Sequence, residues 1–308
     1  MTSLSPALIA SHIRPFQAWR DAFPVSRLLE ICFEVNQERR QGWGAILLDR
    51  VNRWVQSSFL PDGYVWEEGG EIVGNISLIR IQYRRRSIVL IANVAVHPQF
   101  RRRGIGRALV EVALESPIAR KAGEIWLHVR ADNEGAIALY EQLGFHVQAR
   151  RTVWYAFTSM EIPPFGSCTV HSLSRAAWPQ AKSWLETFHP AELGWYHQWN
   201  WEDVRPGWEM SLWHWLMGMP VQRWMSLCGE DLQASLIWYP SLRNENGLWL
   251  AHAPNAQPQA ILSLLWVARR ALYLSRRTLY LEHPSGDLDE VLRAAGFSPT
   301  RTLLWMRR

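Results

Sequence analysis

Lysine is scarce in this sequence of 308 residues. The chain has 33 basic residues, of which only Lys121 and Lys182 are lysines, so arginine carries nearly all of the positive charge. The formal net charge is +5 and the isoelectric point is about 9.4. A preference for arginine does not by itself identify an acidic partner. A nucleic-acid surface would also need basic residues interleaved with exposed aromatic rings on one face, so nucleic-acid binding is kept only as an alternative.

Cysteine is also scarce, and long apolar runs are absent. Cys32, Cys168 and Cys228 are odd in number and far apart, which predicts a reduced, cytoplasmic protein without a disulfide framework. No run of 18 apolar residues occurs, so no transmembrane helix is expected. The N-terminal residues show neither an early basic region nor an extended apolar core, and we expect no signal peptide.

What the chain does contain is a strand, a glycine turn and a helix start in close succession. Residues 88–96 form an apolar run that predicts a buried strand, and Pro98 ends it. Three arginines lead into Gly104-Ile105-Gly106, and an amphipathic run follows at residues 107–114. Glycines let the backbone turn tightly, and the free N–H groups at a helix start attract an anion. The pattern predicts a phosphate-binding loop, with a solvated turn as the alternative.

Two common phosphate-binding motifs do not fit this loop. A nucleotide P-loop has Lys-Ser/Thr after its second glycine, where this chain has Arg107-Ala108. The dinucleotide fingerprint needs a small residue three places after the second glycine, where this chain has Leu109. What remains is Arg101-x-x-Gly104-x-Gly106 behind a strand.

A second motif follows downstream. Residues 124–130 alternate between apolar and polar side chains, which predicts a strand. The segment from Asn133 to Phe145 then reads Asn-x-x-Ala-x-x-Leu-Tyr-x-x-x-Gly-Phe with helical spacing. Asp132 or Asn133 suits the N-cap of this helix, and Gly144 suits the residue that follows it.

The two motifs, in this order, resemble the GNAT (Gcn5-related) N-acetyltransferase superfamily over about residues 60–157, and most of all its ribosomal-protein alanine acetyltransferases. The resemblance implies an α/β (α+β) fold with a mixed, mostly antiparallel sheet flanked by helices. It also implies acetyl-CoA as the acetyl donor, with no metal. The residues that it places at the coenzyme are Val94, Ala95, Val96, Arg101, Arg102, Arg103, Gly104, Ile105, Gly106, Arg107, Asn133 and Tyr140.

Tyr140 is the candidate general acid, because the family has its catalytic tyrosine at this position of the motif. A tyrosine pKa of about 10 lies above a thiol pKa of about 8.5, so at neutral pH the phenol keeps a proton that it can donate to the leaving thiolate. A backbone N–H near residues 94–96 is the candidate oxyanion donor. The alternative is a core tyrosine on an amphipathic helix.

At the expected general base the chain departs from the family. The alanine-acetyltransferase branch has a glutamate two residues into its Leu-x-Val strand, where this chain has His128. A histidine pKa of about 6.5 suits proton abstraction near neutral pH. A water-mediated base, no dedicated base, or a histidine that merely faces the cleft are the alternatives. Asn133 would hydrogen-bond the pantetheine arm of the coenzyme, or serve only as the helix N-cap.

The chain is long enough for two domains, and its second half resembles a worn copy of the first. A strand–turn–strand pattern at residues 70–77 recurs at residues 229–236, and the Gly-Phe pair recurs at Gly296-Phe297. The copy has no glycine or arginine after its central strand, and Leu292 stands where Tyr140 would map. An unrelated α/β domain is the alternative. We expect tandem acyl-CoA N-acyltransferase folds, with a catalytic domain at 1–160, a linker at 161–167 and a degenerate domain at 168–308.

The predicted function is transfer of acetyl from acetyl-CoA to a primary amine on a small molecule or a peptide N-terminus, with the second domain shaping the acceptor site. Alternatives are an acyl-CoA-binding regulator without turnover and a basic nucleic-acid- or protein-binding module. The 19 tryptophans, most of them after residue 150, favour core packing over an aromatic-walled pocket. Helical patterns around residues 25–35 and 43–55 leave open whether the N-terminal segment gates the cleft. No membrane partner is expected, and the oligomeric state, a homodimer included, is left open.

Overall fold

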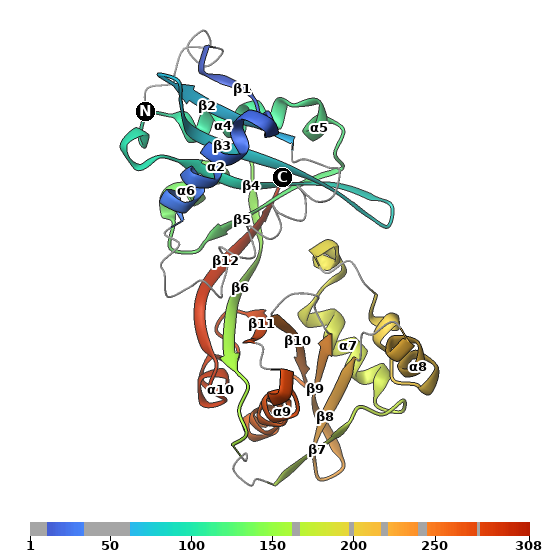
Figure 1. Ribbon diagram of the computed structural model, residues 1–308. Coiled ribbons are helices and arrows are strands. Elements are labelled where there is room, and N and C mark those ends of the chain that lie inside the picture. Colours follow the sequence, from blue (N-terminus) through green and yellow to red (C-terminus); the bar gives the residue numbers. More distant parts are fainter. Residues whose placement is uncertain are drawn as a thin grey trace. The chain divides into compact units, whose positions relative to one another are not determined.

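The computed structural model describes residues 11–33, 62–161, 167–196, 200–216, 221–239, 245–275 and 278–308. The chain forms two compact units, whose elements are labelled in Figure 1. The first unit comprises Met1–Val129, Glu134–Val147 and Met306–Arg308, and the second comprises Arg130–Asn133 and Gln148–Trp305. The helical pattern at residues 43–55 and most of the predicted linker lie outside the described residues.

The first unit is a mixed sheet with helices against it. Its described strands lie in the order β1-β2-β3-β4-β5. Neighbouring strands are antiparallel, except that β4 and β5 run parallel. The strands are β1 Ile13–Pro15, β2 Asp62–Glu68, β3 Glu71–Tyr83, β4 Arg86–Val96 and β5 Glu124–Arg130. The helices are α2 Ala18–Cys32, the 3-10 turn η2 Pro98–Phe100, α4 Ile105–Glu115, α5 Pro117–Arg120 and α6 Glu134–Gln142.

Helix α4 packs closely on strand β3 because a glycine leaves room for it. Leu109 and Val110 of this helix are fully buried, and so is Ala113. A Cβ atom added at Gly74 of β3 would lie 3.0 Å from Leu109 Cδ1 and 3.1 Å from Ile105 Cγ2. The first turn of α4 is thereby held directly against the sheet, which fixes the position of the glycine loop that precedes it.

Strands β4 and β5 pair over only part of their length. The parallel register runs from Ile88 opposite Glu124 to Ile91 opposite Leu127 and then stops. Just beyond this point β4 carries a bulge, where Asn93 has a φ of 53° and the register with β3 shifts. The end of β4 therefore turns away from β5 at the place where the sequence motifs predict the acetyl group.

The second unit is built in the same way. Its strands lie in the order β12-β6-β11-β10-β9-β8-β7. They are β6 His146–Phe157, β7 Cys168–Ser172, β8 Gln222–Cys228, β9 Asp231–Tyr239, β10 Glu245–His252, β11 Thr278–Pro284 and β12 Ser298–Arg307. The helices are α7 Trp178–Phe188, α8 Trp208–Leu216, α9 Pro258–Ala271 and α10 Asp289–Ala294, with 3-10 turns η3 Ala191–Tyr196, η4 Trp201–Val204 and η5 Tyr273–Ser275.

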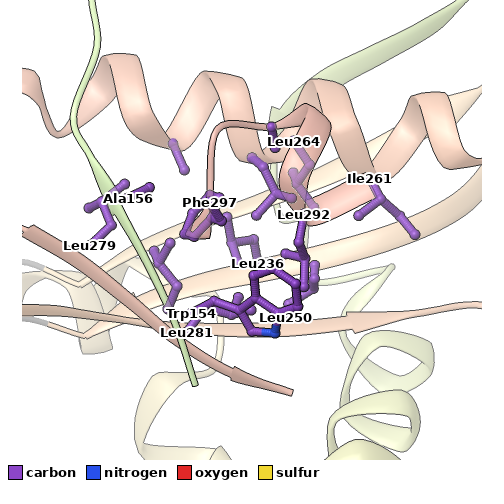
Figure 2. Packing of buried hydrophobic residues seen from close by; sticks show 14 of the residues in the cluster. Trp154, Ala156, Leu236, Leu250, Ile261, Leu264, Leu279, Leu281, Leu292 and Phe297 are labelled. Atoms are coloured by element: carbon purple, nitrogen blue, oxygen red, sulfur yellow. The ribbon is translucent and has the colours of Figure 1, made fainter. Parts of the chain in front are cut away.

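The largest described core belongs to the second unit. Figure 2 shows side chains of α9 and α10 meeting those of the sheet, with Trp154 and Phe297 among the large rings. Leu292 lies in this core and is 1% exposed. The residue that stands where Tyr140 would map thus serves packing in the second unit. The labelled members of the cluster are Trp154, Ala156, Leu236, Leu250, Ile261, Leu264, Leu279, Leu281, Leu292 and Phe297.

The element order of the first unit recurs in the second. The hairpin of β8 and β9 corresponds to that of β2 and β3, and β10, α9, β11, α10 and β12 correspond to β4, α4, β5, α6 and β6. Strands β10 and β11 are again parallel and again pair over a short register. The predicted fold class, two mixed and mostly antiparallel sheets flanked by helices, is confirmed.

The units divide the chain differently from a cut at residue 160. Residues 151–157 of β6 pair with β11 of the second unit over its whole length. Residues 306–308 belong to the first unit. There the Arg308 N–H donates to Ile125 O at 2.9 Å, and the Ile125 N–H donates to Arg308 O at 3.3 Å. The last strand of each half of the sequence is thus divided between the units. Strand β6 begins in the first unit and continues in the second, and β12 begins in the second unit and ends in the first.

One sequence expectation is wrong. Cys168 and Cys228, expected to be free, form a disulfide with a Cα–Cα distance of 4.3 Å. The two residues face each other in the antiparallel pair of β7 and β8, a proximity that their separation of 60 residues in the sequence hides. Cys32 stays a free thiol. The cysteine argument for a reducing compartment is weakened accordingly. Among the described helices none is long and apolar enough to cross a membrane.

Candidate active site

The glycine loop of the first unit presents a row of free backbone amides. Arg102 has a φ of 66° and Gly104 a φ of 83°, so the chain turns sharply into α4, whose first helical residue is Ile105. The first helical bond runs from Ala108 N–H to Gly104 O at 3.0 Å. Within the described residues, no hydrogen bond is donated by the amides of residues 102–107. Unpaired amides at a helix start are typical of anion-binding sites, and the role predicted for this loop stays a prediction.

The arginines around this loop have different roles. Arg101 Nε donates to Val96 O at 3.1 Å and so ties the loop to the end of β4. Arg103 pairs with Glu68 at 3.2 Å and lies over the Phe100 ring at 4.8 Å. Arg102 is exposed and has no partner among the described residues. Its guanidinium is therefore the one in this run that is free to meet a phosphate.

Three predicted parts of the site meet around Gly106. A Cβ atom added there would lie 3.8 Å from Val96 Cγ2 and 3.9 Å from Leu139 Cδ2. Val96 ends β4, and Leu139 directly precedes Tyr140 in α6. Arg107 reaches the same helix, where its guanidinium donates to Gln142 Oε1. The loop, the strand end and the helix of the second motif are thus side by side within one unit.

Near its end, strand β4 has a short interruption in its pairing with β3. Ala95 is buried and pairs with Asn75 of β3, whereas Val94 has no partner in the register with β3 or β5. The bulge is held by Asn75, whose Nδ2 donates to Asn93 O at 2.9 Å. Asn93 Nδ2 in turn donates to Ser77 Oγ at 3.3 Å. These hydrogen bonds therefore hold the backbone around Val94 in place, and Val94 is paired with neither β3 nor β5.

Tyr140 lies on the buried face of α6. Its side chain is 6% exposed, and its ring packs edge-on against Phe145 with centroids 6.0 Å apart. Burial raises the pKa of Tyr140 to about 12. Its hydroxyl has no hydrogen-bond partner among the described residues. The phenol consequently keeps its proton at neutral pH.

The two other predicted site residues are His128 and Asn133. His128 lies on β5, one residue past the last residue paired with β4, and is half-buried. Asn133 directly precedes α6, in the short segment Arg130–Asn133 that belongs to the second unit. The roles of both, like those of Tyr140 and the coenzyme loop, remain predictions.

Sequence reasoning missed two polar side chains at this site. Asn75 is 1% exposed in the middle of β3, and an asparagine within an apolar strand was the available indication, because a buried amide needs partners. Cys32, at the end of α2, donates its thiol to Val96 O at 3.3 Å. Burial raises the pKa of this thiol, against a smaller opposing effect of Arg101. Nothing in the local sequence around Cys32 indicates that position.

Comparison with known proteins agrees with this arrangement. Residues 25–145 match the model of the acetyltransferase (GNAT) family. The chain is 46% identical over 66 residues to a [ribosomal protein bS18]-alanine N-acetyltransferase of Escherichia coli, a match that covers 21% of this chain and 45% of that protein. It is 32% identical over 112 residues to N-alpha-acetyltransferase 30 of Xenopus laevis, covering 36% of this chain and 39% of that protein. The chain thus spans less than half the length of these curated relatives.

Solved structures match over nearly the whole chain. A GCN5-related N-acetyltransferase from Sphaerobacter thermophilus has a TM-score of 0.60 at 16% identity, covering 96% of this chain and 94% of that one. A tandem GNAT protein from the clavulanic acid biosynthesis pathway has a TM-score of 0.52 at 17% identity, covering 96% and 97%. At these identities the likeness concerns the fold. Residues 25–145 are therefore similar to the GNAT acetyltransferase family, and the fold of the chain is similar to that of a tandem GNAT protein.

Proposed function

We propose that the first unit is an acetyl-CoA-dependent N-acetyltransferase that transfers acetyl directly to a primary amine. The observation that carries the proposal is the row of amides at residues 102–107, which donate no hydrogen bond within the described residues, next to the end of β4, which no longer pairs with β5. Two glycines support a role of the loop in diphosphate binding: Gly104 has a φ that only glycine adopts easily, and Gly106 lies next to Val96 and Leu139, which keeps the loop close to the strand end and to α6. The names of the matched relatives, N-acetyltransferases of proteins, support the same reaction class.

The chemistry follows from the groups that surround the strand end. The amine nitrogen attacks the thioester carbonyl carbon, and the backbone N–H near Val94 stabilises the negative oxygen that forms. The C–S bond then breaks, and Tyr140 donates its phenolic proton to the leaving thiolate. The proton lost by the amine passes to His128 or to water. Tyr140 is suited to its part because burial holds its pKa at about 12, well above that of a thiol.

The acceptor proposed is an α-amine, on a peptide N-terminus or a small molecule. An α-amine has a pKa of about 7.7–8.0 and is partly neutral at physiological pH, whereas a lysine amine at about 10.4 needs a stronger base. This chain has His128 where the family branch has a glutamate, so an acceptor that needs little deprotonation fits it best. The name of the E. coli relative specifies an alanine of a ribosomal protein, which supports an α-amine acceptor. A cytoplasmic location is part of the same proposal.

Coenzyme binding is the first test of this function. Calorimetry with the full chain should show one acetyl-CoA site. Gly104→Glu should abolish acetyl-CoA binding, because a side chain and a negative charge would enter the glycine loop. The matched control is Gln82→Glu, which adds the same charge near the tip of the β3–β4 hairpin and should bind normally. Normal binding by Gly104→Glu, or no binding by the wild type, would remove the basis of the proposal.

Turnover is the second test, and it distinguishes an acetyltransferase from the main alternative. His128 in place of the glutamate also fits an acyl-CoA-binding regulator without catalysis. Release of free thiol should be followed with a panel of short peptides that differ in their first residue, with the same peptides blocked at the N-terminus, and with lysine side-chain amines. We expect thiol release with free α-amines only. Tight coenzyme binding without release from any amine in the panel would favour the regulator.

A further inference from the structure

The second unit holds a pair of histidines at the place where its central strands separate. Strands β10 and β11 pair only from Glu245 to Leu248 and from Thr278 to Leu281, as β4 and β5 do in the first unit. Past that point His252 ends β10 and His283 lies near the end of β11. Their side chains are 7% and 1% exposed, and their rings lie 5.8 Å apart and nearly parallel. In this unit, imidazoles therefore fill the region where the strands part.

His252 has an oxygen at each of its ring nitrogens. Nδ1 lies 2.8 Å from Ala253 O, and Nε2 lies 3.0 Å from Asp287 Oδ2. A carbonyl and a carboxylate both only accept hydrogen bonds, and a neutral imidazole has one N–H to donate. With Nδ1–H on the carbonyl, the Nε2 lone pair faces the carboxylate. A metal ion between them would be bound by both groups, while the hydrogen bond from Nδ1–H to Ala253 O orients the ring.

His283 adds a second nitrogen to the same point. One of its ring nitrogens, Nδ1, lies 4.0 Å from Asp287 Oδ2 and 3.3 Å from Pro284 O. Its other nitrogen, Nε2, is buried and has no hydrogen-bond partner among the described residues. One ligand atom from each of His252, His283 and Asp287 lies within 4.8 Å of the other two. Zn²⁺ binds nitrogen and oxygen at about 2.0–2.2 Å, so these side chains would move slightly closer together around the ion.

The surroundings suit a bound ion. Phe188 of α7 packs against both imidazole rings, at 4.4 Å from His252 and 5.0 Å from His283, and restricts their movement. Arg151, whose charge acts on His283 and lowers the pKa of its imidazole after the larger effect of burial, is itself paired with Glu282 at 3.0 Å, and Asp287 supplies the carboxylate beside the two imidazoles. Asp287 is 41% exposed on its side chain, which gives the ion a route from solvent and leaves a position for water.

We propose that His252, His283 and Asp287 form a binding site for a divalent transition-metal ion of the Zn²⁺ class. Two imidazoles and one carboxylate are typical donors for Zn²⁺, Co²⁺ or Ni²⁺, whereas Mg²⁺ and Ca²⁺ prefer oxygen alone. The ion joins the ends of β10 and β11 to the turn that follows β11. It therefore fastens the second unit at the opening which, in the first unit, receives the coenzyme. The sequence does not predict this metal site, because the spacing of the three ligands matches no common metal-binding motif.

Metal titration of the untagged full chain tests this site. After treatment with a chelator and removal of it, the protein should bind one Co²⁺ per chain, seen as visible absorption, and Zn²⁺ should displace it. Asp287→Asn, which changes a partly exposed side chain and keeps its shape, should weaken binding about tenfold or more. His252→Gln should do the same. Asp231→Asn, an exposed carboxylate at the start of β9, should bind as the wild type does.

A second measurement keeps the proposal falsifiable if a variant folds poorly. Zn²⁺ should raise the midpoint of thermal unfolding of the wild type and of Asp231→Asn but not of Asp287→Asn, because an ion that binds only the folded state stabilises it. No uptake of Co²⁺ or Zn²⁺ by the wild type at 1 mM, or equal uptake by Asp287→Asn, would overturn the proposal and leave only the contact between His252 and Asp287. Acetyl-CoA binding by the first unit is measured separately, so the two proposals fail independently.

Discussion

Replacing Tyr140 by phenylalanine should separate the chemistry of this protein from its folding. The tyrosine ring is 6% exposed and packs against Phe145, contacts that phenylalanine keeps. Because the hydroxyl has no partner among the described residues, its removal leaves no group unsatisfied. We expect the free energy of unfolding to change by less than about 1 kcal/mol. The rate of acetyl transfer should fall by about 10²–10⁴-fold, the usual contribution of a general acid.

The assay compares three quantities for Tyr140→Phe and the wild type. Thiol release with a peptide amine gives kcat and kcat/KM, calorimetry gives the affinity for acetyl-CoA, and urea unfolding gives the stability. The acid role predicts a loss in kcat at unchanged coenzyme affinity. A rate within about twofold of the wild type would refute it, since a loss of at least about 2.7 kcal/mol of transition-state stabilisation corresponds to the predicted hundredfold or larger decrease.

Tyr140 also predicts a pH dependence whose sign can be worked out. Burial raises its pKa to about 12 in the folded protein, against about 10 in the unfolded chain. The stability that it contributes is fully present below about pH 10 and is lost as the pH rises toward 12. The wild type should lose this part of its stability in alkaline unfolding measurements, and Tyr140→Phe should not. Equal alkaline profiles would show that the phenol is solvated in the folded state.

Three further perturbations test other parts of the molecule. Asp21→Ala should lower the free energy of unfolding by about 1–3 kcal/mol in urea titrations, because it removes the buried carboxylate that accepts from Arg14 at 2.7 Å, while Glu67 still pairs with that guanidinium. Burial alone would raise the pKa of Asp21, but the Arg14 hydrogen bonds and charge lower it overall. This stability should therefore be present above about pH 3.9 and be lost as the pH falls further. Leu264→Ala, in the fully buried core of the second unit, should cost about 2–5 kcal/mol in the same assay while acetyl-CoA affinity stays unchanged. Asn75→Ala leaves Asn93 O without its donor, and should cost about 1–3 kcal/mol and reduce kcat more than coenzyme affinity, measured by thiol release and calorimetry.

Local features were predictable from the sequence because their causes are local. The turn at Gly104 has the positive φ that its glycine indicated, and α6 ends before Gly144, which has a φ of 85°. The duplicated order of elements also followed from patterns repeated along the chain. Each of these depends on residues close together in sequence, where backbone preference and side-chain spacing decide the outcome.

Features that depend on which strands become neighbours could not be predicted. His252 and Asp287 are 35 residues apart and meet only because β10 and β11 are adjacent. Cys168 and Cys228 meet for the same reason in β7 and β8. The alternation along β6 indicates a strand but not its partner. Strand pairing depends on the whole sheet, so the sequence of a single strand does not identify its partner.

The distribution of the closing strands has a consequence for how the protein is made. The first unit carries the glycine loop and Tyr140, yet Arg308 supplies the backbone groups that pair with Ile125 of β5. While the ribosome is still translating the second half, that edge of the sheet has open N–H and C=O groups. The unit that is synthesised first is therefore completed last, and a nascent chain cut short anywhere in the second half leaves the unit with the predicted active site unfinished.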